Sequence, residues 1–165
     1  MTDKPLVPDF GDDHDRKIAF VCSKGSLDMA YPGLIMANGA LEQGVETHMF
    51  FTFWGMDMIN KSTMHDLKFS PVGNTATHMP AALAPLPGMT AMATSRMRKQ
   101  LEELHVPDVP TFLVHLKDMG AHLWACKMSV DMFDLTTDDM IDELDGVLNV
   151  ADFIEIIDGA QTMFI

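Results

Sequence analysis

Apolar and polar stretches alternate along the chain in an order that predicts strands and helices in turn. An apolar run over residues 18–22 is typical of a buried parallel strand, and a helical pattern follows between Ser26, a typical N-cap, and Gly44. A second apolar run covers residues 45–53. Strand, helix and strand in this order form a βαβ unit, which implies a parallel sheet.

The same alternation continues to the end of the chain. The further predicted strands lie at residues 121–125, 147–148 and 162–165. The further predicted helices lie at residues 54–61, 96–104, 110–119, 137–145 and 150–158. The chain is therefore predicted to be an α/β protein, a three-layer α/β/α sandwich with a mainly parallel sheet of about five strands.

Length and composition divide the chain into three parts. A chain of 165 residues is long enough for one domain with its own core, which we place at residues 17–165. Residues 1–16 are polar and acidic, which predicts a flexible tail. Residues 62–95 form an insert rich in methionine and proline. The insert has no charged side chain from residue 69 onward, but its glycines and prolines argue against a membrane span.

The start of the sequence shows no basic region followed by an apolar one, so no signal peptide is expected. Two cysteines are too few for the disulfide framework of a secreted domain. We therefore expect a cytoplasmic protein with reduced thiols and without membrane association.

The charge of the chain is strongly acidic and unevenly distributed. There are 24 Asp and Glu residues against 11 Lys and Arg, a net charge of −13, which argues against nucleic acid as a partner. Residues 128–165 contain ten acids and no Lys or Arg, whereas residues 61–105 contain five basic and three acidic residues. Identical subunits could dock through these two complementary regions.

Methionine is unusually frequent, with 16 residues, of which seven lie between residues 54 and 97. Two more, Met128 and Met132, follow the second cysteine. Methionine side chains are unbranched and adapt to irregular surfaces. We therefore expect an adaptable apolar surface around the insert and around residue 126.

Chemistry is expected at the carboxyl ends of the strands, where ligands bind in open α/β sheets. Both cysteines lie at such ends, Cys22 after the first strand and Cys126 after the third. Lys127 follows Cys126, and Ser129 could cap a turn over residues 130–133, an arrangement that favours the thiolate. Two aspartates in the same segment disfavour the thiolate because their negative charges repel it.

Other common sites are not predicted. No glycine-rich phosphate-binding motif follows the first strand, no GxSxG motif occurs, and the seven histidines show no metal-binding spacing. We therefore expect neither a cofactor nor a metal.

Several segments taken together are characteristic. The most specific are Phe-Phe-Thr-Phe-Trp-Gly at residues 50–55 and Ala-Cys-Lys-Met-Ser-Val-Asp at residues 125–131. Further characteristic segments lie at residues 17–21, 36–40, 145–147 and 162–165. On these segments the chain resembles the DsrE/DsrF-like sulfur-relay family, in particular its subgroup with a Met-rich insert, over residues 17–165.

The resemblance implies a parallel α/β sandwich that assembles into oligomers and works in sulfur relay. In this role Cys126 accepts sulfane sulfur as a persulfide and passes it to a partner thiol, as a sulfur carrier or a sulfurtransferase. We expect Lys127, Ser129, Trp54 and Cys22 to support the site. The implied partners are rhodanese-like or TusA-like proteins and further copies of the chain in a homo-oligomer. The chemistry needs neither metal nor nucleotide.

Two other hypotheses stay open from the sequence. Cys22 and Cys126 could form a disulfide-based redox switch, which requires Cα atoms within about 7 Å of each other. Alternatively, the chain is a non-catalytic oligomeric assembly module with inert cysteines, and its Met-rich insert is buried between identical subunits.

Overall fold

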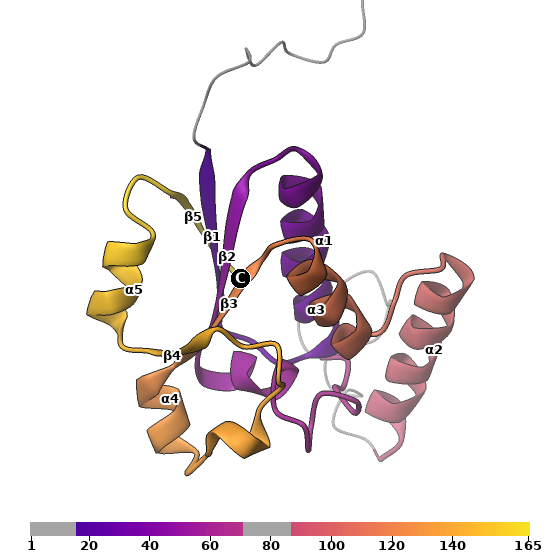
Figure 1. Cartoon of the computed structure of the whole chain (residues 1–165). Coiled ribbons are helices and arrows are strands. Elements are labelled where there is room, and N and C mark those ends of the chain that lie inside the picture. The colour runs from indigo at the N-terminus through magenta and orange to yellow at the C-terminus, as the bar shows by residue number, and fades with distance from the viewer. Residues whose placement is uncertain (1–15, 71–86) are drawn as a thin grey trace, which may run out of the picture.

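The computed structural model describes residues 16–70 and 87–165, which contain a five-stranded sheet whose strands are all parallel. The strands are β1 (Lys17–Cys22), β2 (Glu46–Phe51), β3 (His122–Cys126), β4 (Gly146–Leu148) and β5 (Gln161–Phe164). Their spatial order is β4-β3-β2-β1-β5. With helices on both faces, the predicted three-layer α/β/α sandwich is confirmed (Figure 1).

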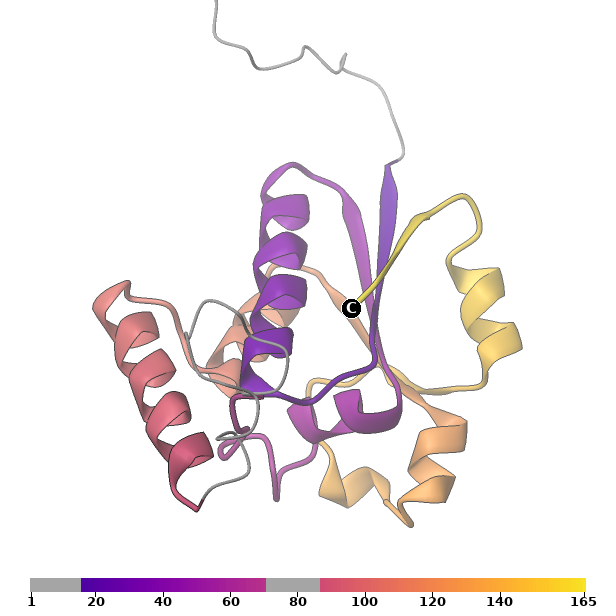
Figure 2. The ribbon, with the colours of Figure 1, turned by 180° about the vertical axis from the view of Figure 1, so that it is seen from behind.

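Three helices form the outer layers of the sandwich. Helices α1 (Leu27–Glu42) and α3 (Val109–Asp118) lie on one face of the sheet, and α5 (Val150–Ile156) lies on the other (Figures 1 and 2). The Asp108 carboxylate caps α3 by accepting a hydrogen bond from the Thr111 amide, and the Asn149 side chain caps α5 in the same way.

Successive side chains along each strand point to opposite faces of the sheet and therefore form two separate cores. Phe20 of β1 and Leu123 of β3 point to the side of α1 and α3 and are fully buried in the main core. Phe50 of β2 and Cys126 of β3 belong to a smaller core on the α5 side. The rings of Phe50 and Phe153 stack there with centroids 4.2 Å apart, which fixes α5 over the middle of the sheet.

Helix α2 (Met89–Glu103) begins inside residues 62–95, the segment described above as an insert rich in methionine and proline. The sequence predicts this helix only from residue 96. The helix begins earlier, at Met89, directly after Gly88, whose φ of 87° lies in the left-handed region. The Thr94 hydroxyl accepts from the Phe69 amide and ties the helix to the chain before it. Helix α2 lies farther from the sheet than α1 (Figure 2). The remainder of the insert, residues 71–86, and the predicted tail up to residue 15 lie outside the described residues.

A second difference concerns the segment before β4. The helix predicted over residues 137–145 is only the 3-10 turn η4 (Thr137–Asp139), which a capping box begins. After this turn Met140 pairs with Asn60, and the Ile141 amide donates to the Ile59 carbonyl at 2.9 Å. Met140 and Ile141 are buried in this extended segment. The burial of their apolar side chains stabilises the extended conformation more than the local sequence pattern favours a helix.

Candidate functional site

The carboxyl edge of the sheet gathers the ends of three adjacent strands. Cys22 is the last residue of β1 and Cys126 the last residue of β3. The strand between them, β2, leads through Thr52 into the 3-10 helix η1 (Phe53–Met58). Helix α4 (Lys127–Met132) starts directly after Cys126. Both η1 and α4 therefore lie at the edge where the sequence predicts the chemistry (Figure 1).

Ser129 connects α4 to η1. Its side chain is fully buried, and its Oγ accepts a hydrogen bond of 2.8 Å from the Phe53 amide and lies 3.3 Å from Oγ1 of Thr52. Ser129 does not cap a turn over residues 130–133, as the sequence suggested. Cys126 takes the N-cap position of α4, so Ser129 lies inside the helix and its hydroxyl is directed to η1 instead.

Cys126 is buried, yet its thiolate is favoured. Only 1% of the residue is exposed, and this burial, the largest single influence, raises the pKa of the thiol. Hydrogen bonding to the sulfur by the Thr52 hydroxyl, the amide and hydroxyl of Ser129 and the Met128 amide acts in the opposite direction. The hydrogen bonds prevail, so the pKa of Cys126 lies below its usual value. This arrangement favours nucleophilic sulfur chemistry.

The start of η1 has a strained backbone. Phe53 has φ 47°, in the left-handed region that bulky residues rarely adopt, and its amide is the one that donates to Ser129. The next turn approaches β1 closely: a Cβ added at Gly55 would lie 2.0 Å from the carbonyl oxygen of Cys22. Glycine is therefore required at residue 55, and it lets η1 pack directly against the strand end.

Lys127 lies beside Cys126 in sequence but is directed elsewhere. Its ammonium group forms an ion pair with the Asp131 carboxylate, one turn along α4, and both side chains are exposed. The groups that lower the pKa of Cys126 are the hydroxyls and amides described above. The local thiolate stabilisation thus comes from hydrogen bonds, not from the neighbouring lysine that the sequence suggested.

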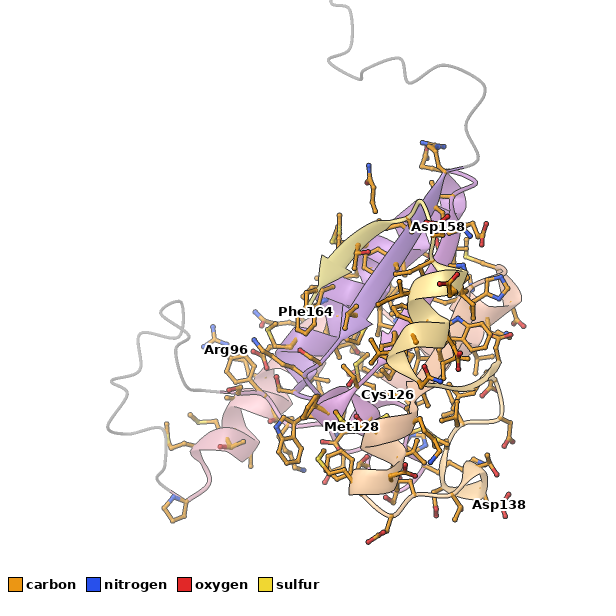
Figure 3. The ribbon with its side chains drawn as sticks, turned by 90° about the vertical axis from the view of Figure 1, so that its left-hand side faces the viewer. Arg96, Cys126, Met128, Asp138, Asp158 and Phe164 are labelled. Carbon is orange, nitrogen blue, oxygen red and sulfur yellow. The ribbon has the colours of Figure 1, made fainter. Side chains whose placement is uncertain are left out.

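Trp54 and the methionines of α4 lie on the surface at this edge. Trp54 is 62% exposed, and its ring packs against Phe133 with centroids 5.4 Å apart. Met128 and Met132 are about half exposed, at 53% and 48%. Met128 lies beside Cys126 in the side-chain view (Figure 3). Exposed apolar side chains therefore lie on η1 and α4, the two elements at the Cys126 end of the sheet.

Cys22 lies apart from Cys126, and the hypothesis of a disulfide switch between them is wrong for this fold. Strand β2 separates their strands, so their Cα atoms are about 10 Å apart at ordinary strand spacing, beyond disulfide reach. Their side chains also point to opposite faces, Cys22 to the main core and Cys126 to the smaller one. Burial raises the pKa of Cys22 to about 12, so this thiol stays protonated.

Sequence reasoning missed Thr52 and the Phe53 amide as parts of the site. Thr52 follows β2 directly, so the strand-end rule that pointed to the cysteines could also have pointed to it. The role of Phe53 depends on a backbone conformation that no sequence pattern signals. Within residues 16–70 and 87–165, no group of three His, Cys, Asp or Glu side chains is placed to hold a metal ion.

Comparison with known proteins settles the family. The model of the DsrE/DsrF/DrsH-like family matches residues 14–165. The chain belongs to this family. Among its relatives is the sulfur carrier protein DsrE2 of Allochromatium vinosum, 33% identical over 135 residues that cover 77% of this chain and 84% of the relative. Another is the uncharacterized protein YrkE of Bacillus subtilis, 24% identical over 155 residues that cover 91% of this chain and 97% of the relative.

The fold of this DsrE/DsrF/DrsH-like chain also occurs among solved structures. A protein of unknown function from Methanobacterium thermoautotrophicum superposes with a TM-score of 0.57 at 10% identity, over 92% of this chain and 100% of the other. At this identity the similarity shows a shared fold alone. No helix among the described residues has both the length and the apolar character needed to cross a bilayer.

Proposed function

We propose that this protein works in sulfur relay, holding sulfane sulfur as a persulfide on Cys126 and passing it to a partner thiol. The observation that carries the proposal is the position of Cys126 at the carboxyl end of β3, beside Thr52 and Ser129, whose hydrogen bonds outweigh burial and lower the pKa of the thiol. Membership of the DsrE/DsrF/DrsH-like family, and a relative named as a sulfur carrier, support the same role.

The relay consists of two exchange steps that balance without an oxidant. In the first, the Cys126 thiolate attacks the outer sulfur of a donor persulfide, the sulfur–sulfur bond of the donor breaks, and the donor leaves as a thiolate. In the second, a partner thiolate attacks the outer sulfur on Cys126, and Cys126 leaves as a thiolate. A low pKa increases the attacking thiolate in the first step and improves the leaving group in the second.

The hydrogen bonds at the site serve both steps. Cys126 attacks as a thiolate in the first step and leaves as a thiolate in the second, and the hydroxyls of Thr52 and Ser129 stabilise that charge in both. Because Cys126 is 1% exposed, both steps require the side chains over the sulfur to move aside. Thiol exchange depends on access as well as on pKa.

The test is the intact mass of the protein after incubation with inorganic polysulfide and removal of excess donor. We expect the wild type and Cys22→Ser to gain the mass of added sulfur, and Cys126→Ser to gain none. Cyanide should then remove the sulfur as thiocyanate and restore the original mass. No mass gain in the wild type, or an equal gain in Cys126→Ser, would overturn the proposal.

The near-complete burial of Cys126 favours one competing function, a non-catalytic assembly module with inert cysteines. This alternative requires the protein to form oligomers and to keep its cellular role without the thiol. Full activity of Cys126→Ser in a cellular assay of sulfur transfer would support the alternative, whereas a monomer in sedimentation experiments would argue against it.

A further inference from the structure

Four large apolar side chains are exposed on η1 and α4, the two elements at the Cys126 end of the sheet. We call them the apolar patch: Phe53, Trp54, Met128 and Met132, each between 44% and 62% exposed. Phe53 and Trp54 begin η1, and the two methionines share one face of α4 because they are four residues apart. Exposed apolar side chains gathered in this way mark an interaction surface, and methionine adapts to the surface it meets.

The segment that follows α4 carries three exposed aspartates, Asp134, Asp138 and Asp139, which we call the acidic rim. Asp134 follows Phe133, whose ring packs on Trp54. Asp138 lies at the same end of the molecule as Met128 (Figure 3). Among the described residues, no Lys or Arg side chain forms an ion pair with any of the three rim carboxylates. Lys61 lies close by and donates a hydrogen bond to the backbone carbonyl of Asp138, but its ammonium group is paired with the Asp142 carboxylate, so the rim keeps a net negative charge.

From these two features we infer that the patch and the rim together dock a second, different protein whose reactive cysteine is flanked by Lys or Arg. The inference rests on the proposed function and names the chemistry of the partner. Complementary charge steers such a partner to the surface and orients it there. The patch and the bound partner then exclude water from the reacting sulfur atoms while the partner sulfur approaches Cys126.

Charge also favours such a partner over a second copy of this chain at the same place. Each copy carries a net charge of −13, so two copies repel each other at long range. The weakly basic stretch, residues 61–105, has only two more basic than acidic residues. A partner with a basic surface around its cysteine matches the acidic rim far better.

The test uses two short synthetic peptides that differ only in the charge around one cysteine. In one the cysteine is flanked by lysines and in the other by glutamates, and each is supplied as a mixed disulfide with thionitrobenzoate. The Cys126 thiolate attacks the peptide sulfur and the coloured thionitrobenzoate leaves, so absorbance gives the rate. Cys22→Ser serves as the background, so Cys126 is the thiol that reacts.

We expect the lysine peptide to react about tenfold faster than the glutamate peptide at low salt, with the ratio falling as salt is added. Asp134→Asn combined with Asp138→Asn should reduce the ratio at least about threefold. Asparagine tolerates the φ of 51° at residue 134, so the backbone there is preserved. The matched control, Glu42→Gln with Asp118→Asn at the C-terminal ends of α1 and α3, should leave the ratio unchanged.

The apolar patch is tested separately. Met128→Gln with Met132→Gln should slow the lysine peptide, while Val114→Gln, at an exposed apolar position on α3, should not. Equal rates for the two peptides, or no reaction of Cys126 with either, would overturn the inference. The inference would also be wrong if the wild type sedimented as a dimer and Asp134→Asn with Asp138→Asn sedimented as a monomer. The protein that binds at the patch would then be a second copy of this chain. Disulfide exchange needs no stored sulfur, so this result is independent of the mass experiment above.

Discussion

The backbone nitrogen of Phe53 lies 2.8 Å from Oγ of Ser129, and this hydrogen bond fastens the start of η1 to the middle of α4. Since Ser129 Oγ accepts the Phe53 proton, its own proton is available to Thr52 Oγ1 or to the sulfur of Cys126. One buried hydroxyl thus takes part both in closing the edge of the sheet and in favouring the thiolate.

Removing the Ser129 hydroxyl should affect both the stability of the fold and the pKa of Cys126. Ser129→Ala leaves the Phe53 amide without its acceptor, and we expect a loss of about 1–3 kcal/mol in the free energy of unfolding. The pKa of Cys126 should rise, because a hydrogen bond that favours the thiolate is lost. Urea unfolding measures the first effect, and ultraviolet thiolate absorbance as a function of pH, in a Cys22→Ser background, measures the second.

Two further variants separate these effects. Thr52→Val should also raise the pKa of Cys126, with a smaller effect on unfolding because the Phe53 amide keeps its acceptor. Ser95→Ala, at an exposed position on α2, should change neither property. An unchanged Cys126 pKa in both Ser129→Ala and Thr52→Val would show that these hydroxyls do not stabilise the thiolate.

The close approach of η1 to β1 should make Gly55 intolerant of any side chain. In Gly55→Ala the new Cβ would lie 2.0 Å from the Cys22 carbonyl oxygen, so the backbone must shift. We expect destabilisation of about 3 kcal/mol or more and slower exchange at Cys126. Gly39→Ala is the matched control: its Cβ meets no atom within 4 Å, and a helical alanine there should stabilise by about 0.5–1 kcal/mol. Similar stabilities of the two variants would contradict this prediction.

Cys22 should make the fold sensitive to alkaline pH. Its pKa rises from 9.0 to about 12 on burial, so the folded state favours the protonated thiol. The stability that this group contributes is fully present at pH values below its pKa in the unfolded state. It is lost as the pH rises from that pKa toward the higher pKa in the folded state. By about pH 10.5 the wild type should lose roughly 2 kcal/mol relative to its stability at neutral pH through this group alone.

The comparison that isolates Cys22 uses urea unfolding at a series of pH values. Cys22→Ala should lose less stability on going to alkaline pH than the wild type. Cys126→Ala should show an alkaline loss at least as large as the wild type, because the lowered pKa of Cys126 stabilises the folded wild type as the pH rises. If Cys22→Ala and the wild type lost stability in parallel, the burial of Cys22 would not be the cause.

The sheet and the position of Cys126 at its carboxyl edge could be predicted because they depend on local pattern. The apolar run at residues 18–22 and the helix that follows it determine a βαβ unit, and the strand-end rule then points to Cys126. The predicted helix over residues 137–145 failed because Met140 pairs with Asn60, a contact between segments far apart in sequence. Only tertiary structure decides such a case.

The inner detail of the site was beyond prediction for a similar reason. The contribution of Phe53 depends on its φ of 47°, and that of Ser129 on a helix that starts at residue 127. The relation of the two cysteines depends on the strand order, which places β2 between them. No spacing in the sequence reveals any of these three facts.

The position of β2 between the two thiols bears on how long sulfur can be stored. A thiol within reach of a persulfide would attack its inner sulfur, close a disulfide and release hydrosulfide, so the cargo would be lost. The sheet keeps Cys22 on the far side and protonated, which blocks this internal discharge. On the proposed function, β2 would separate a persulfide on Cys126 from the second thiol of the chain, so the stored sulfur would go to an outside acceptor and not to Cys22.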